Sequence, residues 1–87
     1  MTRVLTIVNE KGLHARASAK FVQLVEKFAA EVWVTRGSET VGGTSIMGLM
    51  MLGAAMGDTI TIHCDGEGCS EALEQLAAMV EDKFGED

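Results

Sequence analysis

The spacing of apolar residues changes several times along the chain, and these changes constrain its fold more than any other feature. Apolar and polar residues alternate over 2–8, 31–36 and 59–64, as they do in strands with one buried face. From 15 to 28 the apolar residues instead recur every three or four positions, which is typical of an amphipathic helix. A run with the same helical spacing covers 70–84. The pattern therefore predicts a mixture of strands and helices.

The segment that follows the second alternating run adds a hairpin and a short helix. Gly37 and Ser38 form a turn signal, and residues 39–43 are predicted to be a strand that returns beside the one before it. Ser45 can cap the N-terminus of a short helix over 46–52. The predicted order is β-α-β-β-α-β-α. This order favours an α+β, two-layer open-faced sandwich, with a four-stranded antiparallel sheet and three helices on one face.

The composition limits the kinds of partner that the chain can have. It carries 7 Lys and Arg residues against 13 Asp and Glu, a net charge of −6, which argues against binding to nucleic-acid phosphates because such binding requires a basic face. No stretch approaches the roughly 20 apolar residues of a membrane span, and no signal peptide is visible at the N-terminus. We therefore expect residues 1–87 to form a single cytoplasmic domain, monomeric, with no nucleic-acid or membrane partner.

The charges are distributed unevenly along the chain. Residues 1–30 hold five Lys and Arg against two Glu, a balance of +3. Residues 31–87 hold two against eleven acids, a balance of −9. The asymmetry indicates that the N-terminal third meets an anionic group, either a phosphate or an acidic protein surface. On charge alone, a chance distribution in a short chain remains the alternative.

The two cysteines and the second histidine are not expected to form a special site. Cys64 and Cys69 are fewer than the four or more cysteines of a disulfide framework, so we interpret them as reduced thiols in a reducing compartment. His63 and Cys64 are neighbours on a predicted strand and so point to opposite faces, which prevents both from binding one metal ion. We expect no metal and no cofactor, and we place His63 on the solvent side of the sheet.

His14 is the most informative residue for function, because it lies directly before the first predicted helix. The positive end of that helix favours a neutral ring, which leaves one nitrogen available as a nucleophile. The free backbone N–H groups of Ala15, Arg16 and Ala17 could bind a phosphoryl group attached to that nitrogen, and the Arg16 guanidinium could neutralise it. These features predict a phosphoryl-accepting histidine. From residue chemistry alone, an ordinary histidine in a loop remains the alternative.

Two segments of the chain resemble the phosphocarrier protein HPr family of the bacterial phosphoenolpyruvate-dependent phosphotransferase system. Gly12-Leu13-His14-Ala15-Arg16, followed by an amphipathic helix, resembles the active-site segment of that family. Residues 43–53, with the sequence GTSIMGLMMLG, resemble its regulatory-serine region. The two segments lie about thirty residues apart, as they do in the family, and the predicted element order is that of the family fold. The resemblance covers essentially the whole chain.

The resemblance implies a function for three residues. His14 would accept a phosphoryl group on Nδ1 from phospho-Enzyme I and pass it to a IIA-type domain, and Arg16 would neutralise the phosphate. Ser45 would be phosphorylated by the ATP-dependent HPr kinase/phosphorylase. The chain would then be a carrier with a covalent phosphohistidine and not an enzyme. The alternative is a paralogue that serves a regulatory, nitrogen-related branch of the same system. One position departs from the family, because Ala17 stands where the family usually has proline.

The short helix after Ser45 is rich in methionine, which suits a surface that meets more than one partner. A helix of this length buries only one side, so some of its apolar residues must be exposed. The predicted partner interface consists of Ile46, Met47, Leu49, Met50 and Lys20. Two alternatives remain at this point: the methionines fill the core, or the chain is a small binding module in which His14 and Ser45 are only structural.

Overall fold

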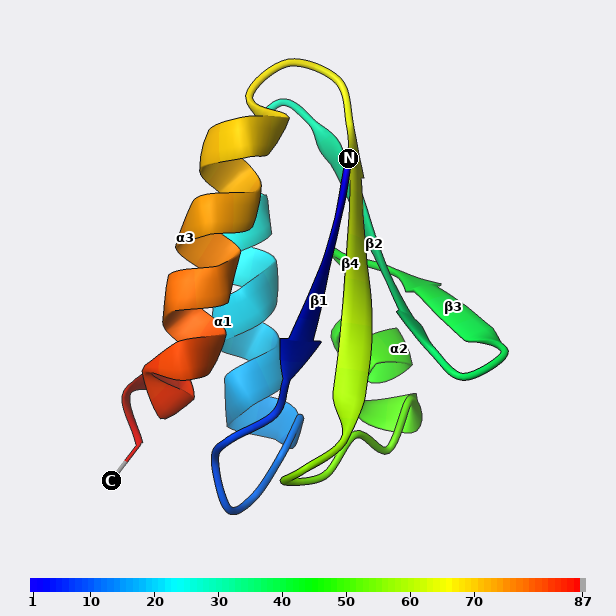
Figure 1. Cartoon of the computed structure of the whole chain (residues 1–87), viewed down its shortest axis with the longest axis vertical. Coiled ribbons are helices and arrows are strands. Elements are labelled where there is room, and N and C mark those ends of the chain that lie inside the picture. The colour runs from blue at the N-terminus through cyan, green and yellow to red at the C-terminus, as the bar shows by residue number, and fades with distance from the viewer. Residues whose placement is uncertain (87) are drawn as a thin grey trace.

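A computed structural model describes residues 1–86 and confirms the predicted open-faced sandwich (Figure 1). The strands are β1 (Thr2–Thr6), β2 (Glu31–Arg36), β3 (Glu39–Gly42) and β4 (Thr59–Asp65). They form one antiparallel sheet in the order β1-β4-β2-β3. The helices are α1 (Ala15–Val25), α2 (Ile46–Met51) and α3 (Cys69–Glu81), followed by the short turn η1 (Lys83–Gly85). Within residues 1–86, no helix has the length and apolar character needed to cross a bilayer.

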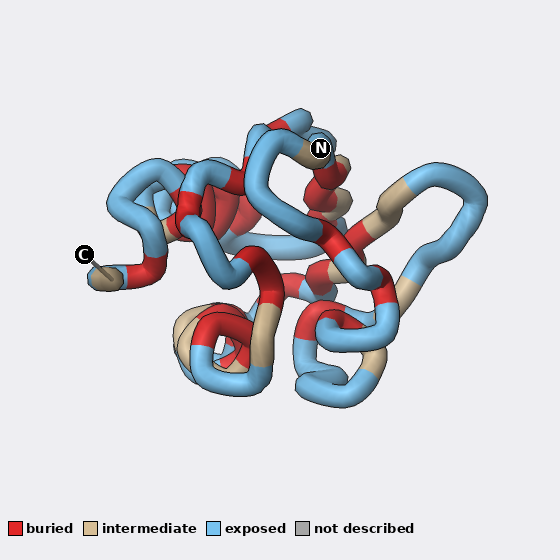
Figure 2. The backbone as a smooth tube through the Cα atoms, turned by 90° about the horizontal axis from the view of Figure 1, so that it is seen from below, coloured by how far each residue is buried: buried red, intermediate tan, exposed pale blue. Residues whose placement is uncertain are grey.

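The core lies between one face of the sheet and the helices. In Figure 2 the buried segments gather in the interior, and the turn between β2 and β3 projects outward as an exposed loop. Val34 pairs with Ile62 across β2 and β4, and both side chains are fully buried. They belong to one apolar cluster that includes Phe21 of α1 and Leu76 of α3. Burial of this sheet face and of one side of each long helix explains the two periodicities of the sequence.

The other face of the sheet is open, as the alternation predicts. Trp33 of β2 stacks on His63 of β4, with ring centroids 5.7 Å apart and planes inclined by 10°. The Oγ1 of Thr35 and the Nε2 of His63 are within hydrogen-bonding distance, at 3.0 Å. His63 therefore belongs to a polar and aromatic sheet face, remote from the buried core.

Three elements end two or three residues before their predicted positions. β1 ends at Thr6. α1 ends at Val25, because the N–H groups of Lys27 and Phe28 bond to carbonyls three positions earlier, as in a 3₁₀ turn. The last helix ends at Glu81, because Lys83 and Phe84 both adopt left-handed backbone angles. Phe84 is buried although it lies outside the helix. Its position in the sequence fits the helical spacing of apolar residues, which is why the predicted helix extended to it.

The prediction of reduced cysteines is wrong. Cys64 near the end of β4 and Cys69 at the start of α3 form a disulfide, with Cα atoms 5.6 Å apart, and both residues are buried. The turn between them contains Gly66 and Gly68 at φ +107° and +90°, backbone angles that favour glycine. The turn brings the start of α3 back against the end of β4, a proximity that cysteine counting could not show.

Reduction of this disulfide is expected to lower the free energy of unfolding by about 2 kcal/mol, because a bridge that closes a short loop restricts the unfolded chain only modestly. Urea unfolding followed by circular dichroism, with and without a thiol reductant, measures the difference. The Cys64→Ala/Cys69→Ala double variant is the control, and its unfolding midpoint should not respond to reductant. A wild-type midpoint that is equal in both conditions contradicts the prediction.

Candidate functional site

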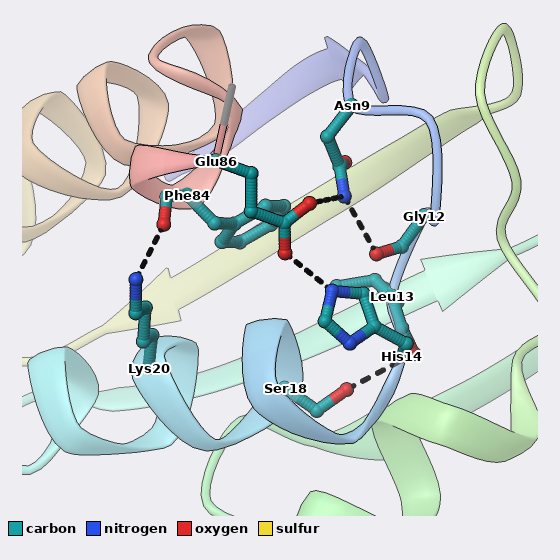
Figure 3. Close-up of polar contacts among 8 residues, drawn as sticks. All are labelled: Asn9, Gly12, Leu13, His14, Ser18, Lys20, Phe84 and Glu86. Carbon is teal, nitrogen blue, oxygen red and sulfur yellow. Dashed lines mark hydrogen bonds and ion pairs between the residues drawn. The ribbon is translucent and has the colours of Figure 1, made fainter.

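His14 occupies the N-cap position of α1, where its extended backbone (φ −75°, ψ −178°) leads from a loop into the helix. Its carbonyl oxygen accepts the first helical hydrogen bond from the N–H of Ser18, at 2.9 Å. The hydroxyl of Ser18, which is fully buried, donates to the carbonyl of Leu13 at 3.2 Å (Figure 3). These contacts of the buried residues Leu13 and Ser18 therefore hold His14 in one backbone position.

Gly12 allows this loop to approach the segment that follows α2. The N–H of Leu13 donates to the carbonyl of Ala54 at 3.0 Å. Gly12 has φ +63°, and a Cβ atom added to it would lie 2.3 Å from the same carbonyl oxygen. Glycine therefore meets two requirements here, a left-handed backbone and an unobstructed contact between two loops.

The first turn of α1 has unpaired backbone donors. Within residues 1–86, the N–H groups of Ala15, Arg16 and Ala17 have no backbone acceptor, and the His14 side chain does not cap the helix. Ala15 and Arg16 are exposed, whereas Ala17 is buried against the core. Residue 17 is alanine and not proline, so its backbone N–H is also available as a donor. The three donors and the Arg16 guanidinium could bind an anion beside the imidazole.

An open hollow of about 590 Å³ lies at this end of the molecule. Its lining residues are Glu10, Lys11, His14, Ala15, Arg16, Lys20, Gly85 and Glu86. Three of these side chains are cationic and two are carboxylates, so the lining is more basic than the chain as a whole. Among the predicted site residues, the hollow brings together His14, Ala15, Arg16 and Lys20, and its lining does not include Ser45 or the apolar residues of α2.

Glu86, which was not predicted as a site residue, reaches the site from the C-terminal end of the described chain. One carboxylate oxygen, Oε2, is paired with Nε2 of His14, and the other accepts a hydrogen bond from Nδ2 of Asn9 at 3.0 Å (Figure 3). These contacts with His14 and Asn9 hold the pKa of the Glu86 carboxyl below its ordinary value. The two paired residues are 72 positions apart. No local spacing in the sequence could reveal such a pair.

Lys20 also contacts the C-terminal segment. Its ammonium group donates a hydrogen bond to the carbonyl of Phe84 at 2.7 Å (Figure 3). Lys20 was predicted only as part of a partner interface. The structure places it between the hollow and η1, where it joins α1 to the segment that carries Glu86.

Ser45 and α2 form a separate exposed surface. The Ser45 hydroxyl oxygen accepts a hydrogen bond from the N–H of Gly48 at 3.0 Å, so Ser45 caps the helix as predicted. Leu49 is fully buried, which corrects its assignment to the partner interface, because a docked protein cannot reach it. The exposed apolar residues, called here the α2 patch, are Ile46, Met47, Met50 and Met51.

The α2 patch is tied to the sheet through Arg36 of β2. One guanidinium nitrogen donates to the carbonyl of Leu52, just after α2, at 3.0 Å, and the other is paired with Asp58 at 2.9 Å. Asp58 also accepts a hydrogen bond from the N–H of Ala55. This bond and the neighbouring Arg36 lower the pKa of the Asp58 carboxyl. The segment that supports Gly12 is thus held by charged hydrogen bonds.

The Gly12→Ala variant is expected to lose about 3 kcal/mol of unfolding free energy, because the methyl group combines left-handed strain with overpacking against Ala54. Gly37→Ala is the matched control: Gly37 has nearly the same φ, +61°, but nothing within 4 Å of an added Cβ. That variant should lose about 1 kcal/mol. Chemical denaturation of both proteins measures the losses, and equal losses would contradict the role of the Ala54 contact.

Known proteins are similar to this chain in sequence and in fold. A family model described as the PTS HPr component phosphorylation site matches residues 1–82. The phosphocarrier protein HPr of Neisseria meningitidis serogroup A is 49% identical over 82 residues, which cover 94% of this chain and 92% of that protein. The phosphocarrier protein NPr of Shewanella violacea is 40% identical over 86 residues, which cover 99% of this chain and 94% of that protein.

A solved structure matches the whole described fold. The crystal structure of HPr-C-His from Thermoanaerobacter tengcongensis has a TM-score of 0.94 at 38% identity, and the match covers 100% of this chain and 98% of that one. The structural match covers the whole chain, and the family model matches residues 1–82 of it. The chain belongs to the HPr family of phosphocarrier proteins of the bacterial phosphotransferase system.

Proposed function

We propose that this protein accepts a phosphoryl group on Nδ1 of His14 from phospho-Enzyme I and passes it to a IIA-type domain. The observation that carries the proposal is the position of the imidazole at the start of α1, beside the unpaired N–H groups of the first helical turn. These donors and the Arg16 guanidinium are available to phosphate oxygens without any rearrangement of the backbone. The protein supplies position and charge compensation, the two contributions that phosphoryl transfer requires.

The transfer step needs no further reactant. The Nδ1 lone pair of His14 forms a bond to phosphorus, while the bond from phosphorus to the donor breaks and the donor keeps that electron pair. A IIA-type acceptor then removes the group by the same chemistry in the opposite direction. Because the histidine is restored only when the acceptor takes the phosphoryl group, we propose a carrier and not an enzyme with its own turnover. The proposed mechanism uses no metal or cofactor.

The proposed setting follows the family role. We propose that residues 1–87 act as a single monomeric domain in the cytoplasm, without nucleic-acid or membrane partners. Enzyme I and the IIA-type domain would dock on the α2 patch and on the basic side of α1 that includes Lys20. Reduced thiols were one reason to expect a cytoplasmic location, and the Cys64–Cys69 disulfide takes that reason away. The proposed location therefore rests on the family role alone.

A nitrogen-related branch of the system is the second candidate function. The observation that favours it is the similarity to a protein named NPr over nearly the whole chain. Both branches would use His14 in the same way and would differ in their partners. Comparing the initial rate of phosphorylation by the Enzyme I proteins of the two branches, at equal concentrations, distinguishes them.

Incubation with phosphoenolpyruvate and Enzyme I is expected to add one phosphoryl group to the protein, detected by mass spectrometry. The adduct should be labile in acid, as a phosphoramidate is, and the His14→Ala variant should not form it. His63→Ala is the matched control, since His63 lies on the open sheet face, and it should accept phosphate as the wild type does. The absence of any adduct on the wild type would overturn the proposed function.

We also propose that Ser45 is phosphorylated by the ATP-dependent HPr kinase/phosphorylase. Its hydroxyl is exposed at the edge of the α2 patch, and a phosphate there would add about −1.5 to −2 charges to the proposed docking surface. The added charge would repel an acidic partner. The structural role of Ser45 as a helix cap is compatible with this regulation, because a negative group is also favourable at a helix N-terminus.

The Ser45→Asp variant is expected to accept phosphate from Enzyme I roughly tenfold more slowly, the effect of about 1.4 kcal/mol of repulsion. Quench-flow measurement of phospho-His14 formation gives the rate. Ser38→Asp adds the same charge at an exposed position in the β2–β3 turn and should leave the rate unchanged. If Ser45→Asp reacts as fast as the wild type, charge at the α2 patch does not control docking.

A further inference from the structure

The C-terminal segment over 83–86 forms a hook that returns toward His14. Lys83, Phe84 and Gly85 have φ values of +57°, +55° and +76°, so three consecutive residues are left-handed. This conformation is unfavourable for the two residues that are not glycine, and it persists only where surrounding contacts impose it. Two contacts do so here: the Phe84 ring is buried in the core, and its carbonyl accepts the hydrogen bond from Lys20.

The hook places the Glu86 carboxylate in a defined position. Nδ2 of Asn9 donates to Oε1 of Glu86 at 3.0 Å and to the carbonyl of Gly12 at 2.9 Å. Asn9 is almost completely buried, and both of these partners are acceptors, so its amide nitrogen must face them. The Asn9 amide therefore connects the carboxylate to the same loop that carries His14 (Figure 3). Oε2 of Glu86 remains for the imidazole.

The contact between Glu86 and His14 determines which ring nitrogen holds the proton. An ionised carboxylate can only accept hydrogen bonds, so the facing Nε2 must be the donor. The hydrogen bonds that Glu86 accepts lower the pKa of its carboxyl, which keeps it ionised at neutral pH. In the neutral ring the proton is then on Nε2, and the lone pair is on Nδ1.

We propose that Glu86 is a positioning residue for His14, an inference that rests on the proposed function: it orients the ring with the proton on Nε2 and compensates the positive charge that the ring acquires on phosphorylation. The proton stays on Nε2 throughout. The Nδ1 lone pair forms the bond to phosphorus, and the donor keeps the electron pair of the bond that breaks. A carboxylate that faces Nε2–H stabilises the cationic product, as the aspartate of a catalytic triad stabilises its imidazolium.

Two variants separate orientation from charge. Glu86→Gln keeps an oxygen that can accept from Nε2–H but loses the negative charge, whereas Glu86→Ala loses both. Glu10→Gln is the matched control. Glu10 lines the same hollow, but within the described residues the carboxylate that pairs with His14 is that of Glu86. Each variant removes one negative charge from the hollow, so a general electrostatic effect would appear in all three.

The orientation role is tested by the ring ¹⁵N chemical shifts of unphosphorylated His14, recorded at a pH at which the ring is neutral. The wild type, Glu86→Gln and Glu10→Gln should show a protonated Nε2 and an unprotonated Nδ1. Glu86→Ala should show shifts averaged between the two tautomers. Unchanged shifts in Glu86→Ala would overturn the orientation role. This measurement involves no phosphoryl donor, so it decides the point even if the wild type proves not to be phosphorylated.

The charge role is tested by the equilibrium of phosphoryl exchange between Enzyme I and this protein. The pair is partly exposed, with side-chain exposures of 27% and 20%, so the effect is modest. Glu86→Gln should lower the fraction of phospho-His14 at equilibrium by roughly threefold, and Glu10→Gln should not. An equal fraction in Glu86→Gln and the wild type, or an equal decrease in Glu10→Gln, would overturn the charge role. The absence of phosphorylation in the wild type would instead refute the proposed function.

Discussion

The backbone contact between the Gly12 loop and Ala54 determines how the start of α1 lies relative to the α2 patch. The N–H of Leu13 donates to the Ala54 carbonyl, and the absence of a side chain at Gly12 lets the two loops meet. One loop ends at the N-cap of α1, and the other joins the C-terminal end of α2 to β4. The start of α1 and the α2 patch therefore share one rigid support, which Arg36 links to the sheet.

Local charge, and not net charge, controls what the site can receive. The chain is acidic overall, yet the hollow around His14 is lined by three cations and two carboxylates. Charges elsewhere on the surface are largely screened beyond about 10 Å at ordinary ionic strength, whereas those in the hollow act directly on a bound group. One of the two carboxylates, that of Glu86, is bound to His14 and Asn9, so the three cations face a single carboxylate that is not paired with the ring.

Helix α3 connects two features that lie at opposite ends of the molecule (Figure 1). Its first residue, Cys69, is bonded to β4 through the disulfide, and its last turn leads into the hook that carries Glu86. The burial of one side of α3 against the sheet fixes the helix between these points. The Glu86 carboxylate is thus positioned by core packing along the whole helix, and not by local sequence preference.

The sequence by itself determined the order of elements, the Ser45 cap, and the position of His14 and Arg16 at the start of α1, because these follow from periodicity and from neighbouring residues. Only the tertiary structure decided the Cys64–Cys69 bond and the contact of Glu86 with the imidazole, since both depend on how α3 packs. It also decided that Leu49 is buried. Five of the six residues of α2 are apolar, so their pattern cannot show which side meets the core until the neighbouring elements are in place.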